Sequence, residues 1–406
     1  MSSSRNTEAS PGGGPTPSGL SRRSFLVAGA GAAGLLVGGT LGAAVAGDDG
    51  SSATEAPYEP VLRTGTPPVP DEVCADSIRV RGIETRAGAA QQQLAAIAAE
   101  LLDPAKITVV TCGTGSPIPS DRAQASTAVF VGGQFLLFDA GDGAMRSIDD
   151  LDLPVVDVSA IFLTHFHSDH IADVGEVVSR SWIQGRSESD SQRPLPVYGG
   201  PGIDRVVDGF NLAYTPDEVY RTAHHGEAYF PPGTLAAGAQ RIDAATAQGV
   251  VVYDQAGVVV RAYEVDHSPV APSLGYRVEF NGSSVGISGD TIATPGFRAL
   301  AAGVDVLVSD VMDKAFMLDT SCAFERIGDA RNAQLFRDIR TYHIGTGELA
   351  QLSTDSGVGK LVLTHQVPTL PEAQAQQLFE PQITAAFDGD VVVANDGSRV
   401  TIDLGS

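Results

Sequence analysis

The stretch Thr164-His165-Phe166-His167-Ser168-Asp169-His170 directly follows an apolar run at residues 158–163. Such a run predicts a buried β-strand, and in the extended chain beyond it residues two apart point the same way. His165 and His167 can therefore bind one metal ion, while Asp169 and His170 face a second. Imidazole and carboxylate ligands suit zinc, manganese and iron. The chain has only eight histidines, so three within six residues predict a metal site rather than scattered surface histidines.

The order H-x-H-x-D-H resembles the signature of the metallo-β-lactamase fold hydrolases. Other landmarks of that family resemble stretches of this chain, in the family's order, over about residues 106–405. These stretches are residues 111–117, 138–143, 266–268 with 274–277, 288–291 and 363–365. The third of them resembles the ribonuclease Z and arylsulfatase-like branch. The resemblance implies an α/β fold, a four-layer αββα sandwich with the metals at one end of its sheets.

The same resemblance implies a complete ligand set for two metal ions. One ion is bound by His165, His167 and His267, the other by Asp169, His170 and His365, and Asp290 bridges the two. The expected cofactors are two divalent ions, zinc first, with manganese or iron as alternatives. Two such ions lower the pKa of a bridging water, so that hydroxide attacks an electrophilic centre near neutral pH. The sequence therefore predicts a metal-dependent hydrolase.

The leaving group of such a reaction needs a proton, and His343 is the candidate donor. It lies in residues 342–349, a segment that resembles the one in which ribonuclease Z and arylsulfatase-like enzymes carry their general acid. The small hydroxyl residue that usually follows this histidine is replaced here by Ile344 and Gly345. The alternative for His343 is a helix-capping surface histidine. Asp169 and His343 are the expected catalytic residues.

The first 46 residues predict an export signal. Residues 21–26, Ser-Arg-Arg-Ser-Phe-Leu, precede a weakly apolar stretch that ends at Ala46, and together they resemble a twin-arginine signal. An uncleaved membrane anchor is the alternative, since about twenty apolar residues span a bilayer. A G-x-G-x-x-G string at residues 29–34 lacks the preceding strand of a dinucleotide site. We expect twin-arginine machinery to export the protein to the periplasm or beyond, with cleavage near Ala46 and no stable membrane anchor.

The rest of the chain divides into residues 47–105, a linker with a helical lead-in at 89–102, and a catalytic domain at 106–406. Helices are expected inside that domain at about 142–150, 170–182, 293–302, 323–340, 346–356 and 371–386. Three cysteines are too few for a disulfide framework, and a Cys74–Cys322 pair stays open. The net charge of −23, with no basic run, opposes binding to phosphate backbones. Nucleic acid is therefore not an expected partner.

Within the family, the sequence favours small substrates. Glu279 and Asp290 are too close in sequence to admit the long arm with which ribonuclease Z enzymes hold transfer RNA. The expected function is an exported dinuclear hydrolase of small esters, acting on a sulfate ester, a phosphodiester or a lactone. The alternative is a ribonuclease Z-type endonuclease that processes the 3′ ends of transfer RNA. Residues 203–250, which include His224 and His225, are either a lid over the site or a surface excursion with its own small core.

Overall fold

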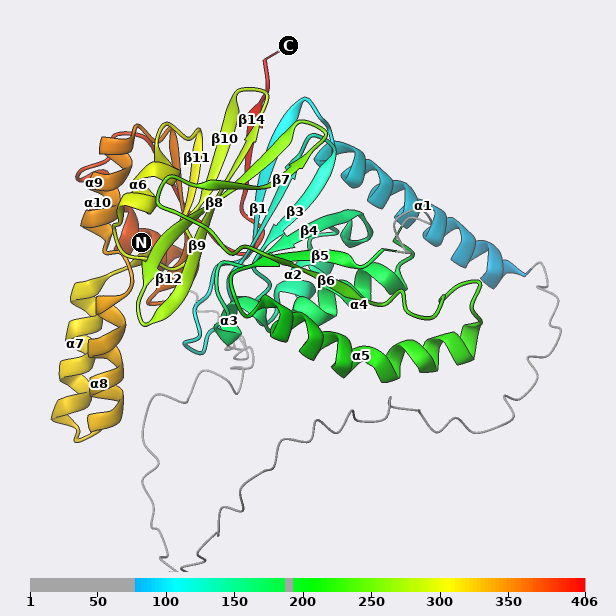
Figure 1. Cartoon of the computed structure of the whole chain (residues 1–406), viewed down its shortest axis with the longest axis horizontal. Coiled ribbons are helices and arrows are strands. Elements are labelled where there is room, and N and C mark those ends of the chain that lie inside the picture. Colours follow the sequence, from blue (N-terminus) through cyan, green and yellow to red (C-terminus); the bar gives the residue numbers. More distant parts are fainter. Residues whose placement is uncertain (1–76, 187–192, 406) are drawn as a thin grey trace, which may run out of the picture. The chain divides into compact units, whose positions relative to one another are not determined.

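The computed structural model describes residues 77–186 and 193–405. Two mixed seven-stranded sheets pack face to face, and helices cover their outer faces (Figure 1). This arrangement confirms the predicted four-layer αββα sandwich. The predicted export signal, most of the linker and Cys74 lie outside the described residues. Among the residues that are described, no helix is long and apolar enough to cross a membrane.

The first sheet has the strand order β14-β1-β2-β3-β4-β5-β6. Its strands are β1 (Lys106–Gly113), β2 (Ser126–Val131), β3 (Gln134–Phe138), β4 (Val158–Phe162), β5 (Leu195–Gly199), β6 (Ala237–Arg241) and β14 (Arg399–Asp403). The helices associated with it are α1 (Ile78–Leu101), α2 (Ala144–Asp150), α3 (Ser168–Ile171), α4 (Val174–Ile183) and α5 (Ile203–His225). β3, β4, β5 and β6 run parallel, so their carboxyl ends meet at one edge of the sheet.

The second sheet has the order β13-β12-β11-β10-β9-β8-β7. Its strands are β7 (Val250–Gln255), β8 (Val258–His267), β9 (Val270–Phe280), β10 (Ser283–Ile287), β11 (Val306–Met312), β12 (Lys360–Val367) and β13 (Asp390–Val393). The helices α6 (Pro295–Ala301), α9 (Thr346–Ser356) and α10 (Glu372–Thr384) pack on its outer face. Here β10, β11, β12 and β13 are parallel, which again brings several carboxyl ends together.

Alternating side chains hold these layers together. On β3, Phe135 and Leu137 pack against the helices, whereas Leu136 and Phe138 pack against the second sheet. This is the period of two that a strand buried on both faces requires. Near the site, the buried Tyr276 hydroxyl donates a 2.7 Å hydrogen bond to the Leu163 carbonyl. That bond joins β9 to the chain at the end of β4, where the metal-ligand motif begins.

The expected single helix at residues 323–340 is wrong. The structure has two helices, α7 (Lys314–Arg326) and α8 (Ala330–Asp338), joined by a short turn. Gly328 in that turn has a φ of 82°, and the Asp329 side chain accepts the backbone N–H of Asn332. A left-handed glycine ends one helix and an aspartate cap begins the next, so the continuous helix is excluded.

The single helix expected at 170–182 is also wrong, because residues 172 and 173 form a turn between α3 and α4. The other expected segments differ mainly in extent. The lead-in helix predicted from residue 89 is longer, because α1 begins at Ile78. Residues 203–250 form the long helix α5, the edge strand β6 and the start of β7. Phe210 and Tyr214 of α5 pack against the core on the helical side of the first sheet, and β6 pairs in parallel with β5.

Candidate metal centre

All seven predicted ligands lie at the carboxyl ends of strands or in the segments that follow them. His165 and His167 follow β4, and the next two, Asp169 and His170, lie on the short helix α3. The others follow or end strands of the second sheet: His267 ends β8, Asp290 follows β10, and His365 lies near the end of β12. The site therefore lies where the two sheets meet at one end. His167 is exposed, and the other six are buried.

Asp290 is the centre of this cluster. Four imidazole nitrogens surround its Oδ2 atom, at 3.4 Å for His170, 3.5 Å for His365, 3.7 Å for His267 and 3.9 Å for His165, each measured to Nε2. Such spacing places one carboxylate between ligands of both sheets. A bridging role for Asp290 fits this arrangement.

Three groups of donor atoms among the described residues are close enough to share an ion. They are His165 with His167, His267 and Asp290; Asp169 with His170 and His365; and Asp290 with His343 and His365. Within each group the donor atoms lie within 4.8 Å of one another. The first two groups contain the same residues as the two predicted sites. The third group makes His343 an alternative ligand. The metal content of the His343→Ala variant, described in the Discussion, tests this alternative.

The chemistry of the cluster suits cations. Burial lowers the pKa of His267 to about 4 and that of His165 well below its usual range, so both imidazoles are neutral ligands at neutral pH. Burial also opposes the charged form of His170, but the carboxylates of Asp290 and Asp139 outweigh it and raise the pKa of His170. The His170 Nε2 atom is buried and has no hydrogen-bond partner among the described residues. A cation there replaces the proton and satisfies that nitrogen.

Asp139, at the end of β3, supports the ligand loop. Its carboxylate accepts the backbone N–H and the hydroxyl of Thr164, each at 2.8 Å, and lies 2.8 Å from His170 Nδ1. A carboxylate on Nδ1 fixes the proton there and turns Nε2 toward the metal. Residues 138–143 resemble a landmark of the family, but the sequence alone predicts no role for Asp139. The feature that could have indicated this role is an acidic residue directly after a strand that neighbours β4.

His343 lies between the 3-10 turn η2 (Ile339–Thr341) and α9, and its side chain is buried. Its Nδ1 atom is 3.0 Å from Asp310 Oδ2 on β11. The His343 ring centroid is 5.0 Å from that of His267 and 5.4 Å from that of His365. The alternative of a surface histidine is therefore wrong. Asp310, which sequence reasoning missed, orients His343 from a strand that carries none of the predicted ligands.

Five of the seven predicted ligands and His343 line a cavity of about 270 Å³, whereas His165 and His170 are not among its lining residues. The cavity is lined by Ser116, Pro117, Ile118, His167, Ser168, Asp169, His267, Asp290, Met312, Ile339, Tyr342, His343, His365 and Val367. None of these residues comes from the segment 203–250, so the cavity gives no support to the lid interpretation. His224 and His225 are exposed at the end of α5 and take no part in the donor groups of the described residues.

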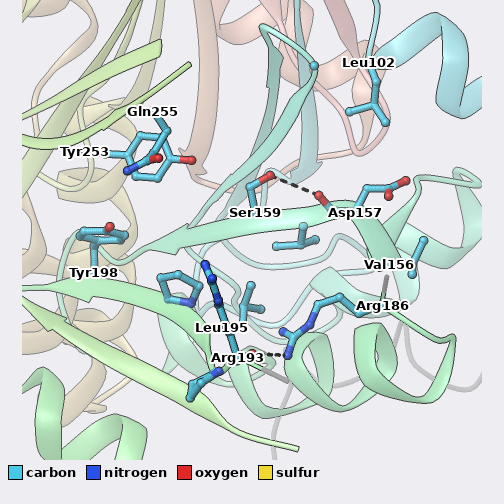
Figure 2. A pocket seen from close by; sticks show the side chains of 14 residues that line it. Leu102, Val156, Asp157, Ser159, Arg186, Arg193, Leu195, Tyr198, Tyr253 and Gln255 are labelled. Carbon is cyan, nitrogen blue, oxygen red and sulfur yellow. Dashed lines mark hydrogen bonds between the residues drawn. The ribbon is translucent and has the colours of Figure 1, made fainter. Parts of the chain in front are cut away.

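A larger cavity, of about 480 Å³, lies at the opposite ends of β4 and β5 (Figure 2). Ser159, Leu195 and Tyr198 are among its lining residues, and Arg186 at its side donates a 2.7 Å hydrogen bond to the Arg193 carbonyl. This cavity contains none of the seven predicted ligands and neither of the predicted catalytic residues. We therefore place the candidate site in the smaller cavity, where the donor atoms converge.

Comparisons with known proteins agree with this geometry. Residues 135–366 match the family model described as the β-lactamase superfamily domain. A ribonuclease Z of Mycobacterium marinum is 37% identical over 297 residues, covering 73% of this chain and 99% of the relative. A ribonuclease Z of Mycobacterium bovis is 35% identical over 297 residues, covering 73% and 98%. The solved metallo-β-lactamase fold protein YhfI from Bacillus subtilis is 18% identical, with a TM-score of 0.49, and the match covers 73% and 100%. The relatives' name goes against the expectation that nucleic acid is not a partner.

Proposed function

Because this chain belongs to the metallo-β-lactamase superfamily and has ribonuclease Z homologues, we propose that it is a phosphodiesterase of the ribonuclease Z type. It is a metal-dependent hydrolase, and RNA is the substrate class that the name of its relatives indicates. The observation that carries the proposal is the convergence of five candidate ligands and the oriented His343 in a single cavity, with His165 and His170 joined to those ligands in the donor groups. The sequence alone favoured hydrolysis of small esters, with the ribonuclease Z-type enzyme as the alternative. The present proposal puts the ribonuclease Z type first.

The residues present fit two divalent ions. His165, His167 and His267 would hold one, Asp169, His170 and His365 would hold the other, and Asp290, whose Oδ2 atom lies 3.9 Å from His165 and 3.4 Å from His170, would serve both. When bound, such a pair supplies Lewis acidity toward the phosphoryl oxygens and acidifies a water molecule. Zinc is the first candidate, because neutral imidazoles and carboxylates are its usual ligands. The buried carboxylates bring negative charge that two cations offset.

His343 is the proposed proton donor to the leaving oxygen. Its Nδ1 atom faces the Asp310 carboxylate, so the ring is held and Nε2 is the atom left to act. Burial raises the pKa of Asp310, although its hydrogen bond with His343 opposes the rise.

One set of observations favours a second candidate, hydrolysis of small esters. β9 and β10 are joined by the tight turn Asn281-Gly282, so no arm extends there from the described chain. Lysine and arginine are absent from the lining of the candidate cavity, and the whole chain carries 49 acidic against 26 basic residues. Phosphate backbones are bound chiefly through such cations. A sulfate ester, a small phosphodiester or a lactone is the substrate class that these features fit.

A direct assay separates the two candidates. Protein of assayed metal content is incubated with a precursor transfer RNA, a small aryl phosphodiester, an aryl sulfate and a lactone. The ribonuclease Z-type proposal predicts cleavage of the RNA at its 3′ side, which Asp290→Asn abolishes. Turnover of a small ester without RNA cleavage would support the second candidate instead. A contaminating nuclease is excluded when the Asp290→Asn protein, purified identically, leaves the RNA intact.

We further propose that residues 1–46 are a twin-arginine signal and that the protein acts in the periplasm or outside the cell. The paired Arg22 and Arg23 before a weakly apolar stretch support this proposal. The double variant Arg22→Lys, Arg23→Lys is expected to accumulate inside the cell as folded, active protein, whereas Arg5→Lys is exported normally. Cell fractionation with an activity assay measures both. Normal export of the double variant would contradict the proposal.

A further inference from the structure

The candidate cavity has two unlike halves. One half contains five of the predicted ligands and His343. The other is a surface that we call the apolar wall, which consists of Ile118, Met312, Ile339, Tyr342 and Val367. A site that binds only the metal ions and a phosphoryl group needs no such surface, so the wall points to a further part of the substrate.

The wall is a small packed unit outside the main core. Met312 and Val367 are buried together with Met317, and Ile118 and Ile339 pack against them while remaining half-buried. These residues come from the chain after β1, the ends of β11 and β12, and the turn η2. Separate segments thus converge and place packed apolar side chains beside the site.

No lysine or arginine lines the candidate cavity, so the wall itself offers no cation to a charged group. Of the neighbouring basic side chains, Lys314 Nζ is 2.7 Å from Glu348, and Arg340 donates a 2.8 Å hydrogen bond from Nε to the Lys314 carbonyl. The wall therefore favours an apolar group over a charged one.

The apolar wall lies on the side of the cavity where His343, the proposed proton donor to the leaving group, is located. Tyr342 precedes His343, and their ring centroids are 5.1 Å apart. The Tyr342 ring also lies edge-on to His267, with centroids 5.0 Å apart. The apolar surface thus adjoins both the proposed proton donor and a predicted ligand. A group protonated by His343 as it departs lies against this wall.

We propose that the apolar wall is a subsite for an uncharged aromatic or aliphatic leaving group of a phosphodiester. This inference rests on the proposed phosphodiesterase function and names small diesters with an apolar leaving group as a further substrate class of that site, besides RNA. In the reaction, water adds to phosphorus and the P–O bond to the apolar group breaks. The departing oxygen takes a proton, and the other product is a phosphate monoester. A cavity of about 270 Å³ leaves room for one ring beside the phosphoryl group.

The test compares three mixed methyl diesters of phosphate, whose leaving groups are phenol, 1-naphthol and 4-carboxyphenol. These leaving oxygens have similar acidity, so chemical reactivity differs little between them. The wall predicts that kcat/KM is highest for the naphthyl ester and lowest for the carboxyphenyl ester. The difference is expected to be roughly 10- to 100-fold, the usual discrimination of an apolar pocket.

Two variants with the same chemical change locate the effect. Ile339→Lys introduces a cation into the wall, and Leu335→Lys introduces one on α8 outside the cavity, where the side chain is 49% exposed. Ile339→Lys is expected to raise the carboxyphenyl-to-naphthyl ratio of kcat/KM by at least about 10-fold. Leu335→Lys leaves that ratio unchanged. Because the ratio is internal to each protein, partial loss of metal or of folded protein cancels from it.

A binding measurement on the wild-type protein gives a second readout. Naphthylphosphonate, which cannot be hydrolysed at its P–C bond, is expected to bind at least about 10-fold more tightly than 4-carboxyphenylphosphonate by calorimetry. Equal turnover of the three esters with equal binding of the phosphonates would overturn the subsite. If metal-loaded protein turns over neither these diesters nor a precursor transfer RNA, the proposed function fails, whereas the phosphonate comparison still tests the wall.

Discussion

Asp139 shows how much of a site can depend on a side chain that is itself no predicted ligand. Its carboxylate faces three partners, the amide and hydroxyl of Thr164 and the ring of His170. The two ligand-bearing segments after β4 are thereby fixed to the neighbouring strand β3. His170 can present Nε2 to a cation only while its other nitrogen is held in this way.

Asp139→Asn is therefore expected to weaken metal binding by about 10- to 100-fold, the usual effect of losing such a support. The amide oxygen still accepts from Thr164, but its nitrogen cannot accept the proton of His170 Nδ1. Competition with a chromophoric chelator measures the affinity. Asp142→Asn, an exposed carboxylate in the same stretch, is the control and keeps wild-type affinity. Wild-type affinity in Asp139→Asn would show that the contact does not support the site.

The role proposed for His343 gives a prediction about leaving groups. His343→Ala should lower the rate on phosphodiesters with poor leaving groups by roughly 10²–10⁴-fold, the usual contribution of a positioned general acid. The nitrophenolate of a nitrophenyl ester departs without protonation, so the rate on such esters should fall far less. Steady-state kinetics with metal analysis measures both, and His225→Ala, an exposed histidine on α5, is the control. Equal losses on both substrates would exclude acid catalysis, and lost metal would make His343 a ligand.

At the scale of elements, short turns at strand ends hold the ligands in place. Gly289, immediately before Asp290, has a φ of 61° in the loop after β10. A Cβ atom there would lie 2.7 Å from the Leu274 carbonyl oxygen and 2.8 Å from Thr164 Cβ. Gly282, in the turn between β9 and β10, also has a positive φ, of 84°, but a Cβ there meets nothing within 4 Å. A substitution at Gly282 therefore meets backbone strain alone, whereas one at Gly289 meets both backbone strain and a steric collision.

Gly282→Ala is expected to lower the free energy of unfolding by about 1–2 kcal/mol, the cost of a left-handed backbone, without loss of metal. Gly289→Ala should cost more, and its metal content should fall, because relief of the collision displaces Asp290. Urea denaturation and metal analysis of the two variants measure these effects. Equal stability and full metal content in both would mean that the loop has room that the structure does not show.

The sequence predicted the elements whose signals are local and missed those that depend on distant partners. Apolar runs predicted the strands, and the resemblance supplied the order of the layers. The residues Asp139 and Asp310 were missed because each is a single carboxylate whose histidine partner lies 31 or 33 positions away. The helix predicted at 323–340 failed for a local reason, since Gly328 and Asp329 form a stop and a cap within an otherwise helical composition.

At the scale of the molecule, the predicted metal ligands come from both sheets. His165 follows a strand of the first sheet, whereas His267, Asp290 and His365 belong to the second. Ions bound across this boundary would stabilise only the assembled sandwich, because an unfolded chain does not bring these ligands together.

Removal of metal by a chelator should therefore lower the urea midpoint of unfolding, and added zinc should restore it. Zinc at 100 times its Kd contributes about 2.7 kcal/mol for one site. Metal analysis of the restored protein should give close to two ions per chain. Asp290→Asn is the control and should gain much less stability from added zinc. Identical midpoints with and without metal would contradict ligation across the two sheets.

The spread of the ligands along the chain also has a consequence for biosynthesis. The first predicted ligand is residue 165 and the last is residue 365, on a strand that pairs with β13 near the carboxyl terminus. During translation the amino-terminal part emerges and collapses first. The nascent chain then carries part of the predicted ligand set while the rest is still unmade. We therefore expect metal to be loaded after the strand that carries His365 has been made, and before any transport of the chain that requires the folded form.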